Sequence, residues 1–178
     1  IYGGLITLGA ASTIQSDAGS LTLSNPGTIT GGGFNLTVTG PGNTTISSIL
    51  GTTSGTLTKT GTGLLTLNGA NTYTGATAIN AGTVVVTNAG LGTAAGTTTV
   101  ASGATLSLAS IASAEPLTIT GAGDLTVANA AFTGGALTST GFSTQSATVT
   151  LAGNATINSI SGLLTLSAAN SVSALTNA

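Results

Sequence analysis

Residues 57–79 read Leu-Thr-Lys-Thr-Gly-Thr-Gly-Leu-Leu-Thr-Leu-Asn-Gly-Ala-Asn-Thr-Tyr-Thr-Gly-Ala-Thr-Ala-Ile. One parity of this stretch carries mostly Leu, Ile, Tyr and Gly, and the other carries mostly Thr and Asn. A period of two residues is the signature of β-strands that bury one face and expose the other. Threonine suits the exposed face, because its β-branched side chain favours strands and its hydroxyl is solvated without a charge.

The same pattern recurs along the chain. The heptapeptide Leu-Thr-x-Thr-Gly-x-Gly begins at Leu36, Leu57 and Leu117, and residues 162–170 echo residues 63–71. The intervals between these starts fit one and three turns of a chain that winds with a period of about 20 residues. We assign a structural repeat to the positions that return: Leu36, Gly40, Gly42, Leu57, Gly61, Gly63, Leu65, Leu67, Asn71, Leu117, Gly121, Gly123, Leu125, Leu164, Leu166 and Asn170.

Alternation combined with this period predicts an all-β solenoid, a parallel β-helix with coils of roughly 20 residues. A two-sheet sandwich would share the alternation but would not explain the period. We expect residues 1–178 to form one segment of about nine coils, on the order of 43 Å long at about 4.8 Å per coil, without a cap at either end. Residues 106–115 are the only helix-tolerant run, and we interpret them as a loop or short turn.

The composition excludes several classes of protein. The chain has 178 residues, one Lys, three acids, no Cys and a net charge of −2. Without a basic patch, nucleic-acid binding is not expected, and without Cys there is no disulfide or thiolate metal site. No apolar run is long enough for a membrane helix. The regular spacing of apolar residues, with 40% hydrophobic content, argues against disorder.

The ionisable residues offer little chemistry. The acids are Asp17, Glu115 and Asp124, and we interpret Glu115 and Asp124 as solvated loop residues rather than a catalytic pair. Lys59 has core-side parity, and we expect its ammonium group to reach water along its aliphatic stem. With no His, Cys or Arg, an activated nucleophile lacks its usual base. We therefore expect no enzyme activity and no catalytic, cofactor or metal site.

Residues 57–86 resemble the autotransporter-associated β-strand repeat of bacterial passenger domains. The resemblance rests on Leu-Thr-Lys-Thr-Gly-Thr-Gly, Leu-Thr-Leu-Asn-Gly-Ala-Asn-Thr-Tyr-Thr-Gly-Ala-Thr and Ile-Asn-Ala-Gly-Thr-Val-Val-Val, with weaker likeness across 28–108. It implies a right-handed parallel β-helix, secreted or displayed on a bacterial surface, often as an adhesin, biofilm component or stalk.

Three functions follow as hypotheses. The first is a structural or adhesive rod within a large surface protein, with an unknown host or matrix ligand. The alternative is a subunit of an extracellular filament, a homo-oligomer in which end coils stack on those of other copies. A minor alternative is an ice-binding solenoid, suggested by Thr37-x-Thr39, Thr58-x-Thr60-x-Thr62 and Thr72-x-Thr74. Against it, we expect the threonine array to lapse between coils.

Overall fold

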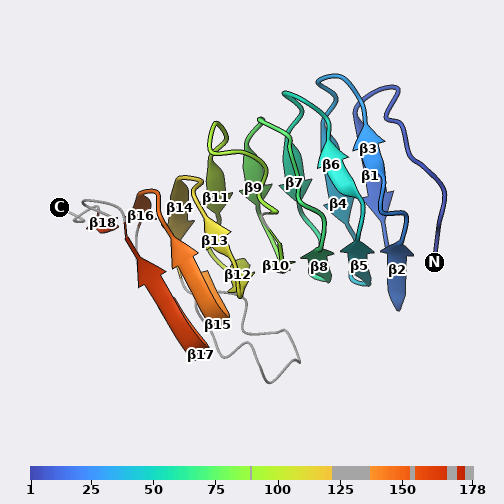
Figure 1. Ribbon diagram of the computed structural model, residues 1–178. Helices are drawn as coiled ribbons and strands as arrows, with labels where there is room; N and C mark the ends of the chain where they lie inside the picture. Colours follow the sequence, from blue (N-terminus) through green and yellow to red (C-terminus); the bar gives the residue numbers. More distant parts are fainter. Residues whose placement is uncertain (89, 122–136, 153–154, 168–171, 175–178) are drawn as a thin grey trace.

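The computed structural model describes the chain except for residues 89, 122–136, 153–154, 168–171 and 175–178. The described residues form β-strands joined by turns, and every strand pair among them is parallel. Strands from successive coils lie side by side along one axis, which Figure 1 follows from the N-terminal end in blue to β17 in red. The predicted parallel β-solenoid is confirmed. No described helix is long and apolar enough to cross a membrane.

Three sheets run along this axis. The first sheet has the order β1(Ser12–Gln15), β4(Leu36–Thr39), β7(Leu57–Lys59), β9(Thr77–Ile79), β11(Thr98–Val100), β14(Leu117–Thr120), β16(Val149–Ala152) and β18(Val172–Ala174). The second contains β2(Ser20–Leu23), β5(Asn43–Ile46), β8(Leu64–Leu67), β10(Thr83–Val86), β12(Thr105–Ala109), β15(Leu137–Gln145), β13(Ala112–Ser113) and β17(Ile157–Leu166). The third consists of β3(Thr28–Thr30) and β6(Ile49–Gly51).

The register of the first sheet gives the number of residues in each coil. Its successive partners are Ser12–Leu36, Leu36–Leu57, Leu57–Thr77, Thr77–Thr98, Thr98–Leu117, Leu117–Val149 and Val149–Val172. Six of the seven steps lie close to the average of about 21 residues per turn, which gives about six regular turns. The step from β14 to β16 is much longer than the others, and the eight strands of this sheet are one fewer than the expected nine coils.

The core lies between the sheets and is built from the parity that the sequence marks as apolar. Side chains of Leu36, Leu57, Leu65, Ile79 and similar residues are at most 2% exposed and form one continuous cluster. Burial of each such side chain contributes roughly 1.5–3 kcal/mol. Small aliphatic residues suffice because each coil adds only a thin layer.

The interpretation of residues 106–115 as a loop or short turn is wrong. This segment contains most of β12 and all of β13. Strand β12 lies between β10 and β15, with Leu106 opposite Val84 and Leu137. The side chains of Leu106 and Leu108 are fully buried. Parallel pairing on both sides overrides the helix tolerance of this stretch, because strand preference depends on neighbours and burial more than on local propensity.

Candidate functional site

The leucines assigned to the structural repeat lie in the interior. Leu36 and Leu57 are neighbours in the first sheet, and Leu117 occupies the equivalent position three coils further on. Leu65 and Leu67 face the core from the second sheet. At the C-terminal end, Leu164 and Leu166 of β17 are only partly buried against the core. Gly123, Leu125 and Asn170 lie outside the described residues.

The repeated glycines lie where successive backbones come closest. A Cβ atom at Gly61 would collide with the backbone of Gly40, and one at Gly63 would collide with the backbone of Gly42. Gly40 also has a φ of +102°, which disfavours other residues. Gly121 has a φ of +74° and lies against Ser102. The Gly-x-Gly element thus forms a corner at which successive coils approach too closely for a Cβ atom.

Asn71 connects three coils. Its side chain is 4% exposed. The Oδ1 atom accepts a hydrogen bond from the backbone N–H of Leu50 at 2.7 Å, and the Nδ2 group donates to the backbone carbonyl of Gly90 at 2.7 Å. Leu50 lies in the preceding coil and Gly90 in the following one. Asn71 therefore pairs backbone groups at a corner where strand hydrogen bonds end.

Lys59 is buried, and the expectation that its ammonium group reaches water is wrong. The residue is 2% exposed and occupies the inward position of β7, between Val38 and Ile79 in the register. Its Nζ group donates to the backbone carbonyls of Gly61 and Ala81, the latter at 3.3 Å. Carbonyl oxygens at the Gly-x-Gly corner take the place of water around the ammonium group.

Glu115 is buried as well, so its interpretation as a solvated loop acid is also wrong. The residue is 3% exposed. Thr98 Oγ1 donates to Glu115 Oε1 at 2.9 Å, Gln145 Nε2 donates to the Glu115 backbone carbonyl at 2.7 Å, and Oε2 has no hydrogen-bond partner in the structure. Burial raises the pKa of the carboxyl from 4.5 to about 7, against the opposing effect of the Thr98 hydrogen bond. Asp124, also interpreted from the sequence as a solvated loop acid, lies outside the described residues.

Tyr73 extends this interior polar cluster along the axis. Its hydroxyl shares a 2.6 Å hydrogen bond with Thr77 Oγ1, and Thr77 is the register neighbour of Thr98. Burial raises the pKa of the Tyr73 hydroxyl, and the nearby Glu115 carboxylate adds to the increase. The cluster therefore favours neutral forms of both groups. Glu115, Leu117 and Ile119 share one parity, and this signal could have placed Glu115 inside from the sequence.

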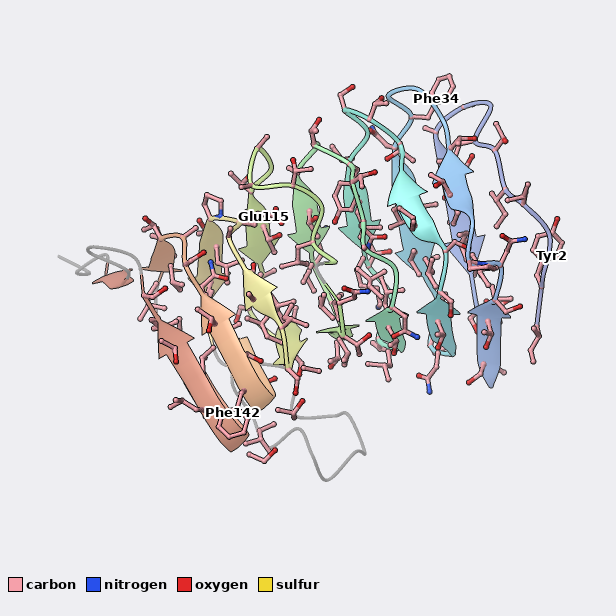
Figure 2. The ribbon with its side chains drawn as sticks, in the orientation of Figure 1. Tyr2, Phe34, Glu115 and Phe142 are labelled. Carbon is pink, nitrogen blue, oxygen red and sulfur yellow. The ribbon has the colours of Figure 1, made fainter. Side chains whose placement is uncertain are left out.

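A cavity of about 150 Å³ adjoins Glu115, lined by Gly90, Leu91, Gly92, Ile111, Ser113 and others (Figure 2 labels Glu115). One carboxyl beside glycine backbones is a poor basis for acid–base catalysis, which needs a second group to activate a nucleophile or a leaving group. Among the described residues, no three His, Cys, Asp or Glu side chains gather into a metal site. The interior cluster thus has the chemistry of a packed polar core.

Two of the corner glycines, Gly61 and Gly63, fall together with Lys59 and Asn71 within one stretch of chain that a known family describes. Residues 57–86 match the family model of the passenger-associated-transport-repeat. The match confirms the resemblance to autotransporter passenger repeats over this part of the chain. No curated protein and no solved structure gives a match.

In this structure the matched passenger-associated-transport-repeat spans β7, β8, β9 and β10. It therefore holds one complete coil and the first-neighbour pairs β7–β9 and β8–β10. The Asn71 bridge and the Gly61–Gly63 corner both belong to it. Glu115 and its cavity lie outside the matched residues, whereas Tyr73 and Thr77 of the interior polar cluster lie within them.

Proposed function

We propose that the chain is a structural rod segment of a secreted or cell-surface protein of the passenger type. The observation that carries this proposal is the unbroken first sheet, in which eight strands stack in parallel, most of them at near-constant steps. The match of residues 57–86 to a passenger-associated-transport-repeat supports an exported location. A rod of this kind holds other parts of a surface protein at a distance from the cell.

The arrangement suits a mechanical role. Seven steps at about 4.8 Å give a first sheet roughly 34 Å long. Every step along the axis is made by backbone hydrogen bonds between strands, and corners are fixed by groups such as Asn71. Each coil contacts chiefly its neighbours, so length can be changed by adding coils without redesigning the core. The role is structural rather than catalytic.

Location tests the proposal. Intact source cells would be labelled with antibody against the chain, with lysed cells as the control. The proposal expects labelling or shedding of the chain without lysis. Labelling only after lysis would contradict it.

A second candidate is a self-assembling filament subunit. It is favoured by the exposure of Ile1 and Leu5, which are 95% and 70% exposed, beside Tyr2 and Thr7, whose backbones pair with Leu23 and Thr30. Added strands from another copy would cover these apolar side chains and continue the sheets. Electron microscopy over a concentration series distinguishes the two: ordered fibres support the filament, and single rods throughout contradict it.

A further inference from the structure

The outer face of the first sheet carries a column of threonines in register. Each coil contributes one outward residue, which lies directly above that of the next coil. Among the side chains that the structure describes, one alanine interrupts the column. The column consists of Thr13, Thr37, Thr58, Ala78, Thr99, Thr118 and Thr150. All seven are exposed or partly exposed. The Thr-x-Thr array therefore lapses between coils as expected, at Ala78 and Asn80 and again at Ala101, whereas the central column taken alone is interrupted only at Ala78.

Flanking positions widen the column into a two-dimensional array. Threonine recurs two residues before the central column at Thr56, Thr97 and Thr148, and two residues after it at Thr39, Thr60 and Thr120. These flanking columns do lapse, at alanines, asparagines, a proline and Gln15. Neighbouring hydroxyls are about 4.8 Å apart along the axis and roughly 6.6 Å apart along each strand, as parallel strand geometry requires.

The chemistry of the central column is nearly uniform, and its flanks are uncharged. Each threonine presents one methyl group and one hydroxyl that both donates and accepts hydrogen bonds. Lys59 points inward from β7 and Glu115 is buried, so neither places a charge on the face. None of the outward strand positions in these columns is charged or aromatic. The face lacks the aromatic platforms on which sugar rings commonly stack, which argues against a polysaccharide occupant.

We propose that this threonine face binds ice. A crystalline water surface is uncharged, periodic and rich in both donors and acceptors, so a rigid lattice of hydroxyls can match it without desolvating any charge. The methyl groups add apolar area that is removed from liquid water on contact. Because the backbone ladder already fixes the spacing, little side-chain or chain entropy is lost on binding. The inference goes beyond the structural role and does not depend on it.

Two matched variants test the proposal. Thr58 on β7 and Thr66 on β8 belong to the same coil, and each is a partly exposed, outward residue in the interior of a sheet. Tyrosine is well tolerated at such strand positions, so Thr58→Tyr and Thr66→Tyr should both fold, as circular dichroism can verify. Thr58→Tyr places a bulky ring in the middle of the face, whereas Thr66→Tyr alters the second sheet only.

The measurements are incorporation of the chain into a slowly growing ice front and thermal hysteresis. The proposal expects enrichment in ice and measurable hysteresis for the unaltered chain and for the control variant Thr66→Tyr, and loss of both for Thr58→Tyr. Exclusion of the unaltered chain from ice, equal loss in both variants, or sedimentation with cellulose in place of ice would each overturn it.

Discussion

Asn71 offers the sharpest test of how the coils are held together. We predict that Asn71→Ala destabilises the solenoid strongly, although the substitution removes only a small side chain. The variant deletes the acceptor for Leu50 N–H and the donor for the Gly90 carbonyl. The site is 4% exposed, so water cannot readily replace either partner.

The magnitude follows from these two contacts. Leaving a buried hydrogen-bonding group without a partner costs about 1–3 kcal/mol, and two such groups give about 2–6 kcal/mol. For a chain of this length, each kcal/mol lowers the melting temperature by roughly 2–4 °C. We expect Asn71→Ala to melt roughly 4–24 °C below the unaltered chain.

Thermal melts followed by circular dichroism measure the loss, and amide hydrogen exchange locates it. Exchange at Leu50 should accelerate well beyond the average change. The matched control is Asn80→Ala, since Asn80 is exposed in the turn after β9, and it should shift the free energy of unfolding by no more than about 0.5 kcal/mol. Equal effects of the two variants, or unchanged exchange at Leu50, would refute the bridging role of Asn71.

Three further predictions concern the corner glycine and the two buried ionisable residues. Gly61→Ala should cost more than about 1 kcal/mol in denaturant unfolding, because its Cβ would collide with the backbone of Gly40, while Gly32→Ala, which has open space around it, should be nearly neutral. The pKa of the Glu115 carboxyl is raised from 4.5 to about 7 in the folded state, so the folded state binds the carboxyl proton more tightly than the unfolded state does. The resulting contribution to the free energy of unfolding is fully present below pH 4.5 and is lost as the pH rises through about 7. The loss amounts to about 3 kcal/mol. Glu115→Gln should flatten that part of the pH profile, and a slope that persists in the variant would contradict the assignment. Lys59→Met keeps the side-chain volume and removes the buried charge, so we expect its unfolding free energy to be equal or higher, whereas Lys59→Ala should lose about 2–5 kcal/mol to a cavity; a clearly destabilised methionine variant would show that the ammonium contacts are required.

The fold could be predicted from the sequence because its signal is repeated. Alternation over residues 57–79 fixes which side chains face inward, and buried Leu57, Leu65 and Ile79 confirm that parity. Recurrence at a nearly constant interval fixes which strands become neighbours. Both signals are local or periodic, so they survive without any knowledge of the rest of the chain.

Two signals conflict for the interior ionisable residues. Glu115 and Lys59 share the parity of buried neighbours, which places them inside, but the usual preference of charged side chains for water points the other way. What decides their burial is a partner in another coil: Thr98 for Glu115, and the Ala81 carbonyl for Lys59. Such partners depend on the register of each strand pair, which an approximate period does not specify.

Irregular coil length also escaped prediction. The step from Leu117 to Val149 is much longer than its neighbours, and a count based on a constant period therefore overestimates the number of coils. Because the coil lengths are unequal, the central threonine column also could not be predicted from the sequence. Thr58, Thr99 and Thr118 come into one line only when the unequal lengths of the coils between them are known.

The most direct test of the account measures a distance along the axis. The chain has no cysteine, so Thr13→Cys and Thr118→Cys can be spin-labelled without other changes and their separation measured by pulsed electron resonance. These residues lie five register steps apart in the central column. Stacked coils predict one narrow distribution centred at about 24 Å between the two backbone positions. A broad distribution, or a single distance far from this value, would contradict the solenoid.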